Sequence, residues 1–379
     1  MIYHLLQFFV EKQYFGLEGH YGYENPLFRA TIAILVAFFV VLMLGPRTIR
    51  LLIHMRLGDI PDFDHKDLNE LTRHKANVPT MGGVLVLFGI IVAVLLLADL
   101  TSFYVITGLF CMLYLGALGF VDDWLKLRGK GQGNSRDGLK LYQKLLFQIG
   151  LGVLLGQYLF YRGPDNFVEV EGVVHQLLTL PFVKQPLLLS IPVFMVMTVL
   201  VVAGTSNAVN LTDGMDGLAG GCVALCCFVF MILAWVVGDA SAAAKLLMPH
   251  VPDAGELSVL CGAMMGACLG FLWYNCHPAQ VFMGDTGSLP LGGLLGFVAI
   301  CLRQELMLLI VGGVFVIEAV SVMLQVGYFK ITKGKRIFLV APIHHHFQLK
   351  GWAETQVVTR FWLLATLFAA LALATTKLR

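Results

Sequence analysis

Long apolar stretches separated by short polar ones run through this chain of 379 residues. Ten of these stretches carry almost no charge and approach the roughly 20 residues that a helix needs to cross the hydrocarbon core of a membrane. They lie at 30–46, 81–98, 103–121, 145–161, 185–204, 217–238, 257–274, 286–302, 306–329 and 361–376. The alternating ten-residue pattern of a transmembrane β-barrel is absent from the sequence. The pattern therefore predicts an all-α polytopic membrane protein with ten transmembrane helices in a single domain, residues 1–379.

Composition supports this prediction, because 58% of the residues are hydrophobic, only 13% are charged, and the mean hydropathy is +0.79. The net charge of +2 gives no reason to expect a nucleic-acid partner. The eight cysteines lie in or beside apolar stretches without a metal-binding spacing, which is typical of buried free thiols. Glu11 and Lys12 interrupt the N-terminal region, so we expect no cleaved signal peptide, and residues 2–15 are typical of a short amphipathic helix on the membrane surface.

Basic residues are distributed unevenly between the two sides of the predicted bundle. The connections at 47–80, 122–144 and 330–360 together hold eighteen Lys and Arg, whereas both tails and the connections near 99–102, 162–184, 239–256 and 303–305 share eight. Basic loops stay on the cytoplasmic side of a membrane. We therefore expect both termini to be extracytoplasmic, and the active site to be formed by cytoplasmic loops near 47–80, 122–144, 205–216, 275–286 and 330–360.

Two adjacent carboxylates, Asp122 and Asp123, end the third apolar stretch, and Lys126 follows one helical turn later. Vicinal acids beside a basic group can hold a divalent cation and a phosphate together. The alternative is a solvated helix end with a snorkelling lysine.

A second polar cluster joins the fifth and sixth apolar stretches and contains Asn207, Asn210, Asp213 and Asp216. The last three residues are spaced three apart, so a turn followed by a helix start could direct them to one side. A capped, tight connection between two helices is the structural alternative.

A third cluster includes Phe282 and Asp285, and Asp285 opens the next apolar stretch. An aspartate beside free backbone N–H groups at a helix start suits a metal and a phosphate-bearing ligand, although it could equally be a simple N-cap. Phe282 could stack on a base or anchor the chain at the membrane edge.

The fourth cluster is the run His344, His345 and His346. Its spacing matches no zinc motif, and imidazoles that orient phosphates fit better, especially after a basic segment. Inside the ninth stretch Glu318 stands alone with Gln325 on the same helix face, where it either lines the site or makes a structural hydrogen bond.

Five segments resemble the polyprenyl-phosphate N-acetylhexosamine-1-phosphate transferase superfamily. They are LTRHKANVPTMGG (71–83), GFVDDWLK (119–126), NAVNLTDGMDGLA (207–219), VFMGDTGSL (281–289) and PIHHHFQLKGWAE (342–354). The last is similar to the muramoyl-pentapeptide branch. The resemblance extends from about residue 27 to 376.

The resemblance implies a homodimeric enzyme of the bacterial cytoplasmic (inner) membrane that needs Mg²⁺. Its substrates would be UDP-N-acetylmuramoyl-pentapeptide and undecaprenyl phosphate, and its products the first lipid intermediate of peptidoglycan synthesis and UMP. By motif match, Asp285 would bind magnesium, and Asp122 and Asp123 would lie at the reacting phosphates. The uracil pocket would contain Lys75, Asp216 and Phe282. The rest of the site would be lined by Thr80, Asn210, Asp213, Gln325 and the histidine run, with His344 as a catalytic residue and Lys126 and Asn207 as substrate-binding residues.

Two alternatives to this function stay open on the sequence. A sister transferase would use UDP-N-acetylglucosamine. A secondary transporter would explain Glu318 and the many spans, but it would place its polar groups near the membrane midplane rather than at one face.

Overall fold

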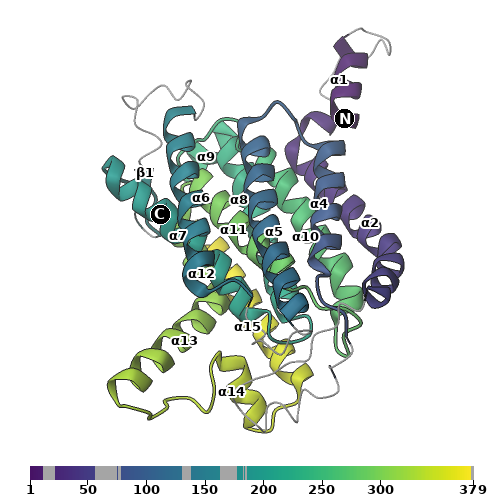
Figure 1. The fold of residues 1–379 in the computed structure, drawn as a ribbon. Coiled ribbons are helices and arrows are strands. Elements are labelled where there is room, and N and C mark those ends of the chain that lie inside the picture. The colour runs from purple at the N-terminus through teal and green to yellow at the C-terminus, as the bar shows by residue number, and fades with distance from the viewer. Residues whose placement is uncertain are drawn as a thin grey trace.

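In a computed structural model the protein is a bundle of helices (Figure 1). The structure describes residues 1–11, 22–55, 75, 78–129, 138–162, 177–181, 183 and 186–376. Its α-helices are α1 (Ile2–Glu11), α2 (Pro26–His54), α4 (Gly83–Leu97), α5 (Phe103–Gly129), α6 (Leu141–Arg162), α7 (Ile191–Thr212), α8 (Leu218–Gly238), α9 (Ala240–Lys245), α10 (Glu256–Asn275), α11 (Asp285–Cys301), α12 (Glu305–Val311), α13 (Gly313–Ile331), α14 (Ile343–Leu349) and α15 (Glu354–Thr375). A 3₁₀ turn, η1 (Gly22–Glu24), and a short antiparallel pair, β1 (Leu177–Leu178) and β2 (Leu187–Leu188), complete the described elements.

Among the described residues, eight helices are long and apolar enough to cross a membrane, which supports a multi-pass membrane protein. Two further apolar helices, α4 and α11, are shorter. The ninth predicted stretch, 306–329, is not one helix, because the chain breaks at Gly312 between α12 and α13. Consecutive glycines at 312 and 313 lower the cost of such a break. Beyond the break, α13 leaves the bundle obliquely (Figure 1).

Several helices extend beyond the apolar stretches that predicted them. Asn25 caps the start of α2 by accepting a hydrogen bond from the Leu27 N–H, and Pro26 occupies the first helical position. The helix then continues to His54, so the first part of the predicted loop 47–80 is helical. Likewise, α5 continues to Gly129, and its last turns therefore carry the acidic residues predicted to start a loop.

The most buried helix is α11, in which all seventeen residues are buried. It packs against α5 and α7, while α10 packs against α2 and α8. Apolar side chains also face outward, for example Leu35, Phe39 and Met43 at four-residue spacing on α2. In a membrane protein such a stripe faces lipid, so the outer surface and the core are both apolar.

Small residues allow α2 and α10 to approach closely. A Cβ atom added at Gly262 or Gly266 would lie 2.4 Å from the Ala30 carbonyl oxygen or 2.1 Å from the Ile34 carbonyl oxygen, respectively. Gly270 continues the same contact one turn later, 2.8 Å from the Phe38 carbonyl oxygen. The four-residue spacing thus places three glycines against one backbone, where they allow the two helices to pack closely.

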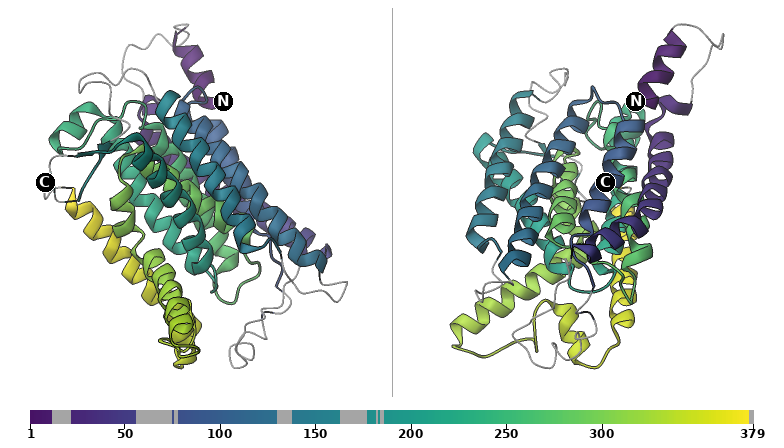
Figure 2. Two further views of the ribbon diagram at one scale, coloured as in Figure 1. Left: turned by 60° about the vertical axis from the view of Figure 1, so that its left-hand side comes forward. Right: turned by 45° about the vertical axis from the view of Figure 1, so that its right-hand side comes forward.

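Helix α1 and the C-terminal end of α15 lie at the end of the bundle opposite to α14 (Figure 2). Near the N-terminal end of α2, the buried Arg29 guanidinium forms a two-point ion pair with Glu256 of α10 and also donates to the Leu97 carbonyl at 3.1 Å. The sequence of residues 239–256 predicts a short helix and a turn, and the structure has α9 there. The sequence at 168–174 predicts a small hairpin about Gly172, which lies outside the described residues.

We predict that Gly266→Ala separates α2 from α10, because the added methyl group overlaps a backbone carbonyl that cannot rotate away. Overpacking of this kind costs about 1–3 kcal/mol. The matched control is Gly150→Ala in α6, where nothing lies within 4 Å of an added Cβ and the helix propensity improves. Thermal unfolding in detergent micelles should show a lower midpoint for Gly266→Ala alone, and equal midpoints for the two variants would contradict this packing.

Candidate active site

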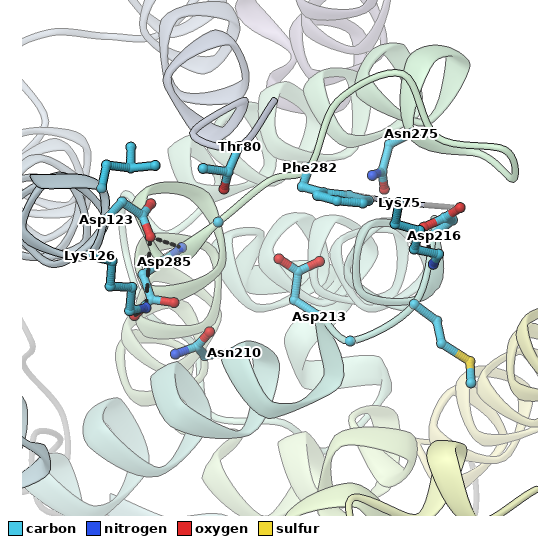
Figure 3. A pocket seen from close by; sticks show the side chains of 14 residues that line it. Lys75, Thr80, Asp123, Lys126, Asn210, Asp213, Asp216, Asn275, Phe282 and Asp285 are labelled. Carbon is cyan, nitrogen blue, oxygen red and sulfur yellow. Dashed lines mark hydrogen bonds and ion pairs between the residues drawn. The ribbon is translucent and has the colours of Figure 1, made fainter. Parts of the chain in front are cut away.

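Helix termini from across the sequence meet at one end of the bundle and enclose a pocket of about 260 Å³ (Figure 3). The helices α5, α7 and α10 end there, and α11 begins there. Nine of the predicted site residues line the pocket, namely Lys75, Thr80, Asp123, Lys126, Asn210, Asp213, Asp216, Phe282 and Asp285. Segments up to 210 positions apart in the sequence, from 75 to 285, therefore contribute to one cavity.

Three buried carboxylates form one end of the site. Oxygen atoms of Asp122, Asp123 and Asp285 lie within 4.8 Å of one another. Asp123 accepts hydrogen bonds from the Asp285 N–H at 3.2 Å and from the Thr286 N–H and hydroxyl at 2.9 and 2.6 Å. Asp123 therefore binds the N-terminus of α11, where free N–H groups and the helix dipole favour negative charge.

Two lysines compensate the negative charge of this cluster. Lys126 Nζ lies 2.6 Å from Asp122 Oδ2 and 3.2 Å from Asp285 Oδ2. Lys144 Nζ bridges the same two oxygens at 2.7 and 2.6 Å. The remaining Asp122 oxygen accepts a hydrogen bond from the Leu139 N–H at 2.6 Å. Lys144 was not among the predicted site residues, although its position directly before an apolar stretch is the signal that identified the others.

The opposite end of the site is organised around buried Lys75. Its ammonium lies 2.6 Å from Asp216 Oδ1 and 2.5 Å from Glu354 Oε1, and the Asp216 N–H donates to the same Glu354 oxygen at 2.9 Å. Asp216 Oδ2 lies 3.1 Å from His277 Nδ1. Asp216, His277 and Glu354 are close enough to share a metal, but Lys75 already supplies a cation to two of them. His277 and Glu354 were not among the predicted site residues, although Glu354 ends one of the five segments that carry the family resemblance.

Backbone pairing fixes Thr80 and Phe282 above the pocket. The Phe282 N–H donates to the Pro79 carbonyl, and the Gly82 N–H donates to the Phe282 carbonyl, both at 2.8 Å. Gly284 follows with a φ of +73°, and a Cβ there would lie 2.6 Å from Asp123 Oδ2. Only glycine fits this turn without strain. The turn delivers Asp285 to the start of α11.

Asp213 lies between the two ends of the pocket (Figure 3). Burial raises the pKa of its carboxyl group well above the ordinary value, and the negative charges of Asp285, Asp123 and Asp216 raise it further. A cation or a hydrogen-bond donor arriving in the pocket would therefore find an under-compensated carboxyl group here.

The three histidines point in different directions, as expected for consecutive residues of a helix. His344 Nδ1 lies 3.0 Å from Glu318 Oε2, and both side chains are fully buried. His345 Nδ1 lies 3.2 Å from Gln348 Oε1, and His346 Nδ1 accepts a hydrogen bond from the Leu339 N–H. The histidine run predicted to line the site therefore occupies three separate environments.

Asn207 and Gln325 make contacts outside the pocket lining. The Asn207 amide donates to Gln148 Oε1 at 2.6 Å, which ties α7 to α6. Gln325 Oε1 accepts hydrogen bonds from the Ile337 and Phe338 N–H groups at 3.0 and 2.9 Å. Asp122 and the histidines also lie behind the surface formed by the lining residues.

Sequence comparisons agree with this arrangement. The family described as Glycosyl transferase family 4 matches residues 105–303, which include α6 and most of α5 and all of α11, the helices that carry the carboxylate cluster and its two lysines. A phospho-N-acetylmuramoyl-pentapeptide-transferase of Desulforapulum autotrophicum is 45% identical over 354 residues, covering 93% of this chain and 94% of the relative. Proteins of the same name from Desulfatibacillum aliphaticivorans and Desulfotalea psychrophila are 46% and 43% identical to this chain, respectively. Each of these alignments covers 100% of this chain and 100% of the relative.

A helical membrane bundle with a charged pocket at one end, together with the match over residues 105–303, defines a membrane-embedded transferase of Glycosyl transferase family 4. Within that class, the chain is 43% and 46% identical over its whole length to two proteins that share one name, which identifies a single family. The chain belongs to the family of phospho-N-acetylmuramoyl-pentapeptide-transferases.

We predict that acidification destabilises the fold through His345. Burial, followed by the neighbouring His344, lowers the pKa of His345 from 6.5 to about 3. The unfolded chain therefore takes up a proton below pH 6.5 that the folded chain does not, and stability falls as the pH falls. Between about pH 6.5 and 5 the loss should be about 1–2 kcal/mol.

The measurement is the free energy of unfolding in mixed micelles at the two pH values, compared with that of His345→Gln. The substitution removes the titrating group, so the variant should lose less stability over the same interval. Identical losses in the two proteins would show that His345 is not the group responsible.

Proposed function

We propose that the protein transfers phospho-N-acetylmuramoyl-pentapeptide from UDP-N-acetylmuramoyl-pentapeptide to undecaprenyl phosphate, with UMP as the second product. The observation that carries this proposal is the pairing of a carboxylate–lysine cluster with a separate polar end around Lys75, inside one pocket at the end of a membrane bundle. Both substrates are phosphate anions, one soluble and one lipid-linked. A pocket at the membrane edge is accessible to both.

The three carboxylates fit a magnesium ion, because hard divalent cations take oxygen ligands. Asp285 is the best placed ligand, since its Oδ2 atom already has cationic partners in Lys126 and Lys144, and Asp122 lies beside it. Both oxygens of Asp123 are engaged by the start of α11, so Asp123 would hold the helix rather than the metal. When bound, magnesium would neutralise developing negative charge on the reacting phosphates.

The other end of the pocket suits the nucleotide. Phe282 offers a ring face for the uracil, with Lys75 Nζ 5.9 Å from the ring centre. Asp216 and Asn275 add hydrogen-bonding groups at the same end. Thr80, Asn210 and Asp213 then line the path towards the carboxylates, over which a sugar diphosphate would extend.

Direct attack by the lipid phosphate is the mechanism that this geometry favours. A phosphate monoester with a second pKa of about 6 is already mostly a dianion at neutral pH, so it is a competent nucleophile without an added base. Neither vicinal carboxylate is free to form a covalent intermediate. Asp122 is held by Lys126, Lys144 and the Leu139 N–H, and Asp123 by α11.

In the proposed mechanism the protein side chains hold positive charges where the phosphate groups react. Lys126 and Lys144 would bind the phosphate oxygens during transfer, since both ammonium groups already lie at the carboxylate end of the pocket. Asp122 would hold the two lysines in place. Such preorganised donors lower the barrier without needing to move as the charge develops.

We further propose that ten helices cross the bacterial cytoplasmic membrane with both tails outside the cytoplasm and the pocket facing inward. The eighteen-to-eight distribution of Lys and Arg supports this orientation. The homodimeric state implied by the family resemblance is part of the same proposal. A secondary transporter is disfavoured, because the charged cluster lies at the ends of α5, α7 and α10 rather than midway along them.

The proposal is tested by incubating the purified protein with undecaprenyl phosphate, Mg²⁺ and one of two nucleotides. We expect UMP release and a lipid-linked product from UDP-N-acetylmuramoyl-pentapeptide but not from UDP-N-acetylglucosamine. Turnover of UDP-N-acetylglucosamine instead would identify a sister transferase, and release from neither nucleotide would refute the proposal.

Metal dependence is predicted to reside in Asp285. Asp285→Asn keeps the shape of the side chain but removes a charge next to two lysines, so turnover should fall by at least about 10²-fold while the helical content is unchanged. The control is Asp253→Asn, at an exposed position with a φ of +58° that asparagine tolerates. Full activity of Asp285→Asn, or of the parent protein in excess chelator, would rule out the metal site.

A further inference from the structure

One face of α13 holds the segment that leads into the histidine run. Glu318, Ser321 and Gln325 are spaced three and four residues apart, and all three side chains are buried. Gln325 accepts from the Ile337 and Phe338 N–H groups, and the Ser321 hydroxyl accepts from the Ile343 N–H at 3.1 Å. Glu318, at the far end of this face, makes a hydrogen bond with His344. The polar face of a membrane helix is therefore used to fix the start of α14.

The contact between Glu318 and His344 is a buried carboxylate–imidazole pair. Glu318 Oε2 lies 3.0 Å from His344 Nδ1, and the exposed fraction of each residue is 0%. A carboxylate only accepts hydrogen bonds, so in a pair with the Glu318 carboxylate Nδ1 is the donor. The hydrogen bond made by one ring nitrogen determines the role of the other. Glu318 thus leaves Nε2 as the nitrogen with which His344 can act.

The Nε2 atom points towards the wall of the pocket. A Cβ added at Gly214, which lines the pocket between Asp213 and Asp216, would lie 2.4 Å from His344 Nε2. Within the described part of the chain, neither His344 Nε2 nor Glu318 Oε1 has a hydrogen-bond partner. A fully buried polar atom without a partner costs about 1–3 kcal/mol. A ligand in the pocket that reached past Gly214 would remove this cost.

We propose that Glu318 is a positioning residue for the transferase reaction, which holds Nδ1 of His344 as the donor so that Nε2 is presented beside Gly214 to the phosphate-bearing substrate. This inference rests on the proposed function and assigns a role to the one acidic residue in the middle of α13. An acid at that depth is costly to bury, and retaining it requires a partner or a function. Glycine at 214 is needed because any side chain would occupy the space in front of Nε2.

The alternative is that Glu318 only anchors α14 to α13. Ser321 and Gln325 already make four hydrogen bonds to the backbone of that segment, so an anchor alone would not need a carboxylate. The two roles differ in what the substitution changes. Loss of an anchor lowers stability, whereas loss of positioning changes the protonated ring nitrogen of His344 and lowers turnover in a folded protein.

The experiment compares Glu318→Gln and Glu318→Leu with the parent protein in two measurements. The first is the ¹⁵N spectrum of histidine-labelled protein, in which His344→Gln identifies the His344 signals. We expect the parent to carry its ring proton on Nδ1 and both Glu318 variants to lose this preference, because an amide offers its N–H₂ group as readily as its oxygen. The second is steady-state turnover, in which kcat should fall about 10–100-fold, the range known for carboxylates that orient metal-bound histidines, with the nucleotide KM within about threefold.

A structural control is Glu256→Gln, which removes a carboxylate from the buried pair with Arg29 at the far end of the bundle. It should lower the unfolding midpoint without changing the His344 signals or kcat. If Glu318→Leu does not fold, Glu318→Gln decides the outcome. An unchanged His344 spectrum or an unchanged kcat in folded Glu318→Gln would overturn the positioning role. Absence of transferase activity in the parent would refute the proposed function, while the spectra would still show whether Glu318 orients His344.

Discussion

The hydrogen bonds from Asp123 to the first residues of α11 are the interaction on which the site depends. All of α11 is buried, and packing against α5 and α7 holds it sideways. A further contact is needed to fix how far α11 extends along its own axis, and therefore where its first residue lies. Asp123 does this by accepting hydrogen bonds from the Asp285 and Thr286 N–H groups. The same contact places Asp285 against Asp122 and places the turn at Gly284 beside Thr80. One helix cap thus brings together the core, the carboxylate cluster and the pocket rim.

Charge compensation is the second constraint, because many ionisable groups are buried at one end of an apolar bundle. Each end of the pocket solves it with opposite charges from different helices, Lys126 and Lys144 among the aspartates and Lys75 between Asp216 and Glu354. Breaking such a pair leaves an uncompensated buried charge, which costs about 3–5 kcal/mol. Asp213 lacks a cation of this kind among the described residues, and burial, followed by the neighbouring aspartates, raises the pKa of its carboxyl group.

Hydrophobic pattern alone predicted the helical membrane class and the position of most helices, since an uncharged run of that length has few other structures available to it. It missed the break at Gly312, because glycines are also common inside transmembrane helices, as Gly266 shows. Motif residues predicted nine pocket-lining positions. Lys144, His277 and Glu354 were not predicted. Lys144 directly precedes an apolar stretch and Glu354 ends a recognised segment, but what brings each of the three residues into the site is a partner distant in sequence, which no local pattern encodes. The divergence of the three histidines could be anticipated from helix geometry, but the burial of His344 against Glu318 required the oblique course of α13.

Glu354, at the first turn of α15, has a consequence for how the protein is made. Ribosomes synthesise the chain from the N-terminus, so Lys75, Asp216 and the carboxylate cluster all enter the membrane before the final helix exists. Until Glu354 emerges, the Lys75 ammonium has one of its two carboxylates and the Asp216 N–H lacks its acceptor. The end of the pocket around Lys75 therefore becomes complete only once α15 is in place. A nascent chain released before that point would contain the carboxylate cluster and the lysines around it, yet lack the contact that closes the opposite end.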